Sequence, residues 1–295
     1  MTRIERKRML TGLAFISPWI IGFVGLTLYP IIMSLHYSFC DYDILSEPVF
    51  IGTLNYQDML IDKVFWKSLS NTFIYAVFAL PLGMAASLFF AVLLNCRIKG
   101  KSLFRVLFFL PSLVPMVATA MIWLWMFNGK FGLLNNMLEM IGINGPSWLN
   151  DELWTKPAMV LTSLWGIGNT IVIYLAALQD VPRELYESAD IDGGNWWHKF
   201  RHITCPMISP VIYFNLVIGI IGSLQVFAQP YIMFGGATGG PNRSALFYTV
   251  YLYETAFSYN KMGYASAMAW VLFIIILLLT WMATKATRKH IHYGG

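Results

Sequence analysis

The chain has 295 residues, of which 57% are hydrophobic and only 12% charged, and its net charge is +5. A soluble globular domain carries fewer apolar and about twice as many charged residues, so this composition excludes that class. The aromatic share of 16% is typical of helices that anchor at the interfaces of a bilayer. The composition therefore predicts an integral membrane protein.

Six apolar runs reach the length of about 20 residues that is needed to cross roughly 30 Å of hydrocarbon. They lie near residues 10–39, 68–94, 104–127, 157–178, 211–234 and 263–283. The first run is longer than the apolar part of a secretory signal and lacks a clear cleavage site, so we expect an uncleaved span. The predicted fold class is all-α: a polytopic membrane protein with about six transmembrane helices.

The distribution of basic residues predicts the orientation of these helices. Fourteen of the 20 Lys and Arg residues lie in four segments: the amino terminus, the second-to-third connection, the loop between the fourth and fifth runs, and the carboxyl terminus. The positive-inside rule places those segments, and hence both termini, in the cytoplasm. The other six basic residues belong to the opposite side: Lys63, Lys67, Lys130, Lys156, Arg243 and Lys261. This asymmetry accounts for the net charge without any need for nucleic acid.

The domain organisation follows from these boundaries. We expect a cytoplasmic basic amino terminus over residues 1–9, a transmembrane domain over 10–284 and a cytoplasmic tail over 285–295. Residues 180–209 form a cytoplasmic loop within the transmembrane domain, which we call the coupling loop for the reasons given below.

No Asp, Glu, Lys, Arg or His stands in the middle of a predicted span. Such residues are costly in lipid and usually mark proton or ion pathways, so their absence disfavours proton coupling and indicates a neutral polar solute. A sodium-coupled secondary carrier stays open as an alternative, because backbone carbonyls alone can bind sodium.

The sequence offers no ATP site and no catalytic constellation. Gly100-Lys101-Ser102 ends like a phosphate-binding loop, but Asn95 occupies the position of its first glycine. The segment 235–241, "GGATGGP", lacks the spacing of a phosphate site and predicts a flexible turn. Isolated cysteines and the pair His198 and His202, without further ligands nearby, indicate no metal site.

The coupling loop contains the sequence "RELYESADIDGGNWWHKFRHITCP" at residues 183–206. Pro182 is suited to the first turn of a helix, and Gly193 and Gly194 would end that helix. Asn195 is a good cap for a second helix, which we expect to end at Pro206. From the residues alone, the tryptophans could rest among lipid headgroups or form a docking surface for a cytoplasmic protein.

The same segment resembles the "EAA" loop of permease subunits in binding-protein-dependent ABC importers. Glu187-Ser188-Ala189 occupies the E-A-A place, Gly193 follows after three residues, and Ile203 to Pro206 come after nine more. Ser188 replaces the central alanine of that pattern, and Cys205 replaces the leucine before the proline. Both substitutes are small, so the resemblance still implies a packed docking surface.

Three further segments resemble carbohydrate-type permeases: residues 238–273, "LYPIIMSLHYSF" at 28–39 and "FIGTLNYQDML" at 50–60. The chain is similar to the larger permease of the maltose systems without its extra amino-terminal helices and external domain. The resemblance implies an ABC type I importer permease in a bacterial or archaeal plasma (inner) membrane. It implies as partners a second homologous permease, two ATPase subunits and an extracytoplasmic solute-binding protein, with the lipid bilayer as surroundings. ATP and Mg²⁺ would be used by the ATPase, no cofactor would be bound by this chain, and the solute would be a sugar, an oligosaccharide or a related polyol.

Two sets of candidate site residues result. The resemblance implies ATPase coupling through Glu187 as a charged anchor, with the full set Glu187, Ser188, Ala189, Asp192, Gly193, Trp196 and Phe200. The polar and aromatic residues in the spans that flank the coupling loop are candidates for the solute pathway: Trp165, Asn169, Ser223 and Gln225. Each polar residue of this second set could instead form a hydrogen bond between helices.

Overall fold

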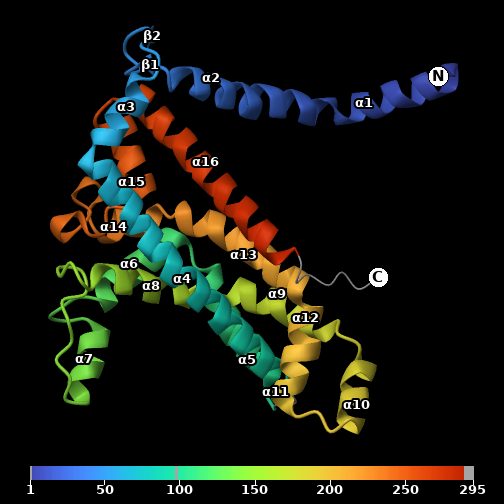
Figure 1. Ribbon diagram of the computed structural model, residues 1–295. Coiled ribbons are helices and arrows are strands. Elements are labelled where there is room, and N and C mark those ends of the chain that lie inside the picture. The colour runs from blue at the N-terminus through green and yellow to red at the C-terminus, as the bar shows by residue number, and fades with distance from the viewer. Residues whose placement is uncertain (1, 97–98, 289–295) are drawn as a thin grey trace. The chain divides into compact units, whose positions relative to one another are not determined.

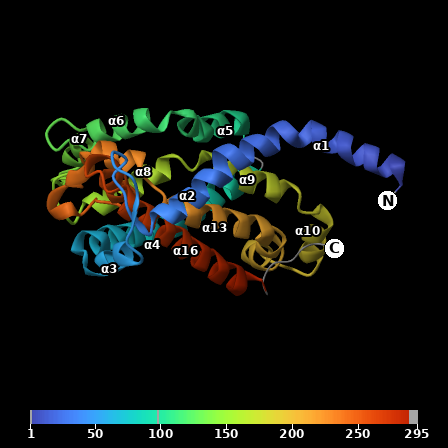
Figure 2. The same cartoon turned by 90° about the horizontal axis from the view of Figure 1, so that it is seen from above.

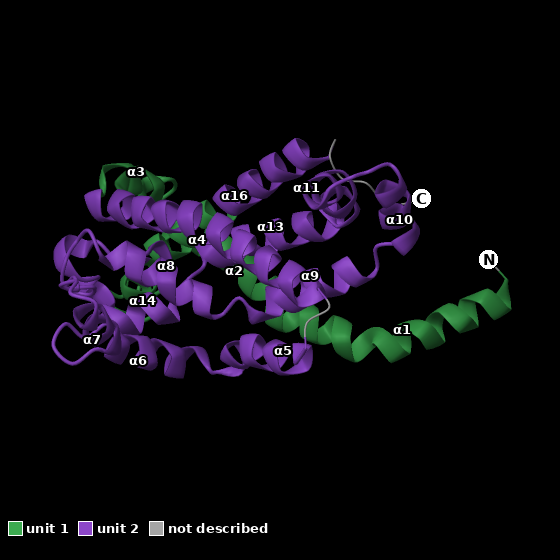
Figure 3. Ribbon diagram, turned by 90° about the horizontal axis from the view of Figure 1, so that it is seen from below, with its two compact units in different colours: residues 1–62, 252–273 green, residues 63–251, 274–295 purple. Residues whose placement is uncertain are grey.

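The computed structural model describes residues 2–96 and 99–288. The chain divides into two compact units, which are coloured separately in Figure 3. Unit 1 comprises residues 1–62 and 252–273, and unit 2 comprises residues 63–251 and 274–295. Arg97, Lys289 and the predicted tail from residue 289 onward lie outside the described residues.

The predicted spans correspond to helices in the structure. Four helices are long and apolar enough to cross a membrane: Arg3–Tyr37, Lys63–Asn95, Ser209–Met233 and Met262–Thr287. Two further candidates are bent pairs, Lys101–Leu113 with Met116–Met126 at 98° and Thr155–Trp165 with Gly168–Gln179 at 49°. The total reaches six if each bent pair is one span, which confirms the all-α, polytopic prediction. The third and fourth predicted runs are thus broken helices rather than continuous ones.

Unit 1 combines the amino-terminal helices with the first half of the last helix. Its elements are α1 (Arg3–Phe23), a π-helix (Val24–Leu28), α2 (Tyr29–Tyr37), β1 (Cys40–Asp41), β2 (Val49–Phe50), α3 (Leu54–Ile61), a π-helix (Glu254–Ser258) and the start of α16 (Met262–Thr287). The strands β1 and β2 are the only ones in the described part of the chain, and they pair antiparallel with Cys40 opposite Phe50.

Hydrogen bonds from α3 hold the short β1–β2 hairpin against the end of α2. The buried Asn55 amide donates to the carbonyls of Ser38 and Cys40 at 3.0 and 2.9 Å, so these turn carbonyls do not need water. The first turn of α16 packs on the same carbonyl of Cys40 through Gly263, where a Cβ atom would collide with that oxygen.

Unit 2 contains the remaining elements, shown in Figure 1. They are α4 (Lys63–Asn95), α5 (Lys101–Phe109), a 3₁₀-helix (Leu110–Leu113), α6 (Met116–Met126), α7 (Leu133–Met140), α8 (Thr155–Trp165), α9 (Gly168–Gln179), α10 (Arg183–Ile191), α11 (Trp196–Lys199), a π-helix (Phe200–Thr204), α12 (Cys205–Met207), α13 (Ser209–Leu224), α14 (Ala228–Met233), 3₁₀ turns at Gly236–Thr238 and Pro241–Arg243, and most of α15 (Tyr248–Tyr253). The long helix α4 packs against α8, α9 and α13 and is the centre of the unit.

Two clusters of buried side chains hold unit 2 together. The first includes Trp123, Phe127, Met159 and Phe247, from helices α6 and α8 and the segment before α15. The second joins α4, α9 and both ends of the coupling loop, and its members are Ala91, Leu94, Ile171, Tyr174, Leu175, Leu178, Val181 and Ile208. Because lipid is as apolar as these side chains, close packing rather than escape from water stabilises such clusters within a membrane. Figures 1 and 2 show α10 and α7 at opposite ends of the unit.

We predict that replacing Gly263 by alanine destabilises unit 1. The new methyl group would meet the Cys40 carbonyl oxygen, a backbone atom that cannot move aside as a flexible side chain could. Overpacking of this kind costs about 1–3 kcal/mol. Thermal unfolding of the detergent-solubilised protein should show a lower midpoint for Gly263→Ala. Gly22→Ala, where no heavy atom lies within 4 Å of the added Cβ, is the control and should not lower it; equal midpoints in both variants would contradict the packing argument.

Candidate functional site

The coupling loop begins with α10, which starts after Pro182 as predicted. It ends in a hydrogen-bonded glycine turn, in which the Gly194 N–H donates to the Ala189 carbonyl at 2.8 Å and the Gly193 N–H to the Asp190 carbonyl at 3.1 Å. This pair of bonds is a Schellman motif, which requires a left-handed residue just past the helix. Gly193 is this left-handed residue, with φ +73°. The turn therefore explains why a glycine stands at this position of the motif.

The second half of the loop begins and ends close to the predicted residues. The Asn195 side chain caps α11 by accepting a hydrogen bond from the His198 N–H at 2.8 Å. The helix passes through the π-helix Phe200–Thr204 into α12, which ends at Met207, one residue beyond the predicted end at Pro206. Pro206 lies in the first turn of α12, where a missing N–H costs little.

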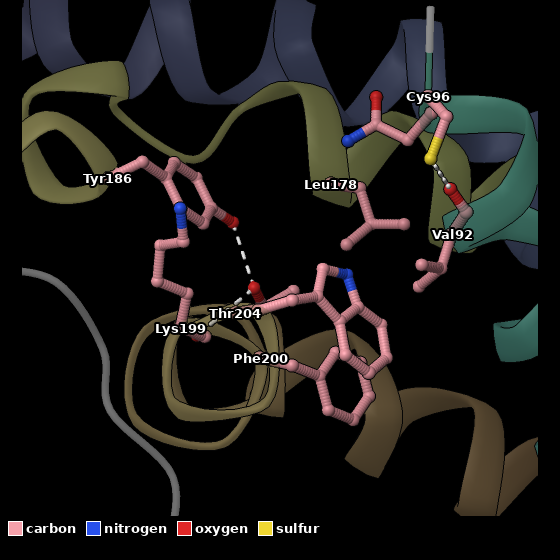
Figure 4. A pocket seen from close by; sticks show the side chains of 9 residues that line it. Val92, Cys96, Leu178, Tyr186, Lys199, Phe200 and Thr204 are labelled. Carbon is pink, nitrogen blue, oxygen red and sulfur yellow. Dashed lines mark hydrogen bonds between the residues drawn. The ribbon is translucent and has the colours of Figure 1, made fainter. Parts of the chain in front are cut away.

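Two side-chain contacts join α10 to the second half of the loop. The Lys199 ammonium forms an ion pair with the Asp190 carboxylate at 2.6 Å. The hydroxyls of Tyr186 and Thr204 are hydrogen-bonded at 2.9 Å, as Figure 4 shows. With Val181 and Ile208 buried in the second cluster at the two ends of the loop, these contacts fix the loop to the helices on which it stands.

The candidate coupling residues are displayed on this loop. Glu187, Ser188, Asp192 and Gly193 are exposed, whereas Ala189 is partly buried. Trp196 is 61% exposed although it stacks on Phe200 with 5.4 Å between the ring centroids. The loop therefore presents acidic and aromatic groups on a rigid support.

A pocket of about 300 Å³ lies between the loop and the last turn of α4 (Figure 4). Its lining residues are Val92, Asn95, Cys96, Leu178, Tyr186, Trp196, Lys199, Phe200 and Thr204. One face of the stacked Trp196 and Phe200 pair thus belongs to this pocket. No sequence pattern predicts this pocket, because its walls come from three separate segments.

The candidate pathway residues lie in different surroundings. Trp165 packs into the first cluster, edge-on to Trp123 with 6.2 Å between the ring centroids. Asn169 and Gln225 are exposed, the first just after the bend between α8 and α9 and the second between α13 and α14. The Ser223 hydroxyl donates to the Ile220 carbonyl at 3.2 Å and lines a pocket of about 270 Å³ shared with α4 and α16. This bond lies within α13 itself and is not the hydrogen bond between helices that the sequence left open as an alternative.

Residues 235–247, which we call the outer loop, are more ordered than the predicted flexible turn. The Asn71 amide of α4 donates to the carbonyls of Arg243 and Leu246 at 2.8 and 3.0 Å, and Thr72 accepts from the Tyr248 N–H at 2.9 Å. Asn242 has φ +48°, a left-handed conformation uncommon outside glycine. Helix α4 therefore holds the loop in this shape. In the sequence, polar residues within an otherwise apolar helix are the feature that could have indicated such contacts.

Glu152, in the loop before α8, ties α4 to the outer loop. One carboxylate oxygen forms an ion pair with Lys67 at 3.1 Å, and the other accepts a hydrogen bond from the Asn242 amide at 2.9 Å. The Asn242 bond, followed by the Lys67 contact, lowers the pKa of Glu152 from its usual value. The outer loop, which contains Asn242, follows α14 directly. In Figures 1 and 3, α14 and α7 lie at the end of unit 2 opposite α10, so this cluster and the coupling loop occupy opposite ends of the unit.

The described residues contain four to six helices that are long and apolar enough to cross a membrane, and a helix–turn–helix loop with a hydrogen-bonded glycine turn. These features are typical of a membrane transport subunit of the permease type. The chain belongs to the family of binding-protein-dependent transport system inner membrane components, whose model matches residues 79–289. It is therefore a permease subunit of an importer and not an enzyme. The comparisons favour this class over the sodium-coupled carrier that the sequence left open.

Several relatives match nearly the whole chain. The probable ABC transporter permease protein YesP of Bacillus subtilis is 40% identical over 99% of this chain and 95% of its own length. The lactose transport system permease protein LacF of Rhizobium radiobacter is 34% identical, with 97% of each chain covered. The arabinooligosaccharides transport system permease protein AraP of Bacillus subtilis is 34% identical over 92% of this chain and 86% of its own length.

A solved structure shares the fold. One chain of a bacterial ABC transporter involved in the import of the acidic polysaccharide alginate superposes with a TM-score of 0.86. The match covers 98% of this chain and 99% of that chain, with 24% identity. The chain therefore has the fold of one chain of that transporter.

We predict that acid weakens the link made by Glu152. A carboxyl whose pKa is lowered by folding stabilises the protein fully above its ordinary pKa of about 4.3, and that contribution is lost as the pH falls through the lower folded value. The difference in unfolding midpoint between the wild type and Glu152→Gln should therefore be constant from pH 8 to about pH 5 and shrink below about pH 4. Glu139→Gln, at an exposed position of α7, is the control. A Glu152→Gln difference that grows on acidification would contradict the assignment.

Proposed function

We propose that this chain is one of the two membrane-spanning subunits of an ATP-driven carbohydrate importer. It would form half of the translocation pathway and take its energy from a separate ATPase, which uses ATP and Mg²⁺, through residues 180–209. The observation that carries this proposal is the coupling loop, whose Glu187 is exposed on a support closed by a Schellman turn, a helix cap and an ion pair. The printed names of the relatives, which include lactose and arabinooligosaccharide systems, support a sugar or oligosaccharide as the solute.

The second cluster supports a mechanical role for the loop. Val181 and Ile208 at the two ends of the loop are packed with Leu94 of α4 and Leu178 of α9. Packed cores move as rigid bodies because they do not deform continuously. When ATP closes the ATPase subunits, a displacement of α10 would therefore be passed to α4 and α9, and it would rock the spans between inward-open and outward-open states.

The implied partners follow from the same arrangement. A second homologous permease would complete the pathway, two ATPase subunits would bind the coupling loops in the cytoplasm, and an extracytoplasmic solute-binding protein would deliver the solute. The outer loop, at the end of unit 2 opposite α10, is the described surface that we assign to the external side. The whole assembly would lie in a bacterial or archaeal plasma membrane.

Within the bilayer, Asn169 and Gln225 are the better candidates for the solute path. Both are exposed, and both stand where a helix is interrupted. Interrupted helices leave backbone groups that need a polar partner, which in a membrane occurs only within protein or along a water-filled cavity. Amide side chains beside such groups could bind the hydroxyls of a sugar. Trp165 and Ser223 would then support the bundle and not touch the solute.

The first test is to extract the protein gently from its native membrane and identify the chains that purify with it by mass spectrometry. A second permease and an ATPase with a phosphate-binding loop are expected. A chain that purifies alone in several mild detergents and still transports after reconstitution would overturn the proposal.

We predict that Glu187→Ala weakens retention of the ATPase about tenfold, because a charged contact at an interface contributes on the order of 1.4 kcal/mol or more. Solute uptake should fall with it, while the amount of protein inserted in the membrane stays at the wild-type level. The matched control is Glu184→Ala, an exposed glutamate one turn earlier on the same helix α10. Undiminished uptake in Glu187→Ala, or an equal loss in Glu184→Ala, would refute the role assigned to Glu187.

A further inference from the structure

An apolar groove of about 450 Å³ runs between α4 and α8 in unit 2. Its walls are formed by Ile74, Tyr75, Phe78, Leu82, Leu153, Lys156, Pro157, Val160, Leu161 and Leu164. The residues at 74, 78 and 82 recur every four positions and so form one row along α4. Phe78 and Leu82 remain 58% and 49% exposed, so the groove is open to its surroundings.

The length of the groove matches half of a bilayer. From Lys156 to Leu164 the helix α8 advances eight residues, which corresponds to about 12 Å at 1.5 Å per residue. One leaflet contributes about 15 Å of the roughly 30 Å hydrocarbon core. The groove therefore begins near the membrane surface, at the first turn of α8, and ends near the midplane.

Lys156 is the only charged residue in the lining, and it stands at the surface end of the groove. The neighbouring acid Glu152 already has two partners: Lys67 contacts one carboxylate oxygen and Asn242 the other. Lys156 has no ion pair within 4.0 Å among the described residues. Lys67, Lys156 and Glu152 together carry a net positive charge, which an anion at the level of the lipid headgroups would offset.

We propose that the groove binds an anionic phospholipid, with one acyl chain along α4 and α8 and the phosphate at Lys156. An apolar channel of leaflet length, with a cation at its headgroup end, has the chemistry of such a molecule. None of the coupling-loop residues lines the groove, and neither do the candidate pathway residues Asn169 and Gln225. Since the bound chain would bridge α4 and α8, it would stabilise the contact between the first and second halves of unit 2.

The binding test uses the transporter purified with its partner subunits, delipidated and titrated with phosphatidylglycerol or phosphatidylcholine under native mass spectrometry. Lys156→Gln should bind phosphatidylglycerol about fivefold more weakly than the wild type, because one lysine near a membrane surface contributes on the order of that factor. Lys63→Gln, which removes an exposed lysine at the start of the same helix α4 but outside the groove, should leave the affinity unchanged. An equal loss of phosphatidylglycerol affinity in both variants would show that only the overall charge of the protein matters, and it would overturn the proposed site.

The groove itself is tested with a phosphatidylglycerol that carries a photoreactive group in its acyl chain. We expect cross-links to peptides that contain residues 74–82 and 157–164, and Leu164→Trp, which fills the midplane end, should lower this labelling several-fold while leaving Lys156 in place. Labelling that avoids these peptides, or that is unaffected by Leu164→Trp, would overturn the proposal. The proposal would also be overturned if a photoreactive residue placed at position 164 cross-linked to the second permease, because that protein, and not a lipid, would then fill the groove.

Discussion

The fold depends on one constraint: within hydrocarbon, each backbone N–H and C=O must find a partner inside the protein. Continuous helices such as α4 and α16 meet it by themselves. The broken spans leave such groups at their bends, where neighbouring segments come close: Gly168 opens α9 so near the Phe108 carbonyl that a Cβ would collide with it. In α4, the Asn71 amide supplies a partner for two carbonyls of the outer loop, and the Thr72 hydroxyl supplies one for the N–H of Tyr248. Polar side chains in the spans are therefore explained first as hydrogen-bond partners of backbone groups. The exposed polar side chains at helix interruptions are the candidates left for contact with a solute.

The same reasoning applies to the rigidity of the coupling loop, which the proposed transmission of force requires. A segment outside the membrane is free to bond with water, so a loop of this length could have been loose. Here the glycine turn, the Asn195 cap and the Lys199–Asp190 ion pair fix the two short helices, although the ion pair alone contributes little at an exposed site. Val181 and Ile208 then anchor both ends in the second cluster. Rigidity comes from several weak contacts that act on one short segment, and the acidic and aromatic groups needed for docking remain outside it.

Sequence reasoning located what is encoded locally and missed what is encoded at a distance. Span positions follow from runs of apolar residues, and the glycine turn and the Asn195 cap follow from residues within a few positions of one another. The π-helix Phe200–Thr204 was not predicted, because the helix signals in the sequence do not distinguish a π turn from an α-helical one. The contact between Lys67 and Glu152 joins residues 85 positions apart, and no pattern in either segment predicts that the two side chains meet. The pocket beneath the coupling loop has the same origin, since Cys96 and Trp196 meet only after the bundle forms.

The sequence places no ionisable side chain in the middle of the predicted spans, which disfavours direct coupling to a proton gradient. The charged and aromatic groups of the coupling loop are concentrated at one end of unit 2, and our proposal is that the work of ATP hydrolysis enters there. Lys156, in the groove between α4 and α8, would have a different partner, the anionic headgroup of a lipid. On these two proposals, charged groups at the ends of apolar spans have different tasks: those of the coupling loop receive force from a protein, and Lys156 binds a lipid that stabilises the contact between α4 and α8.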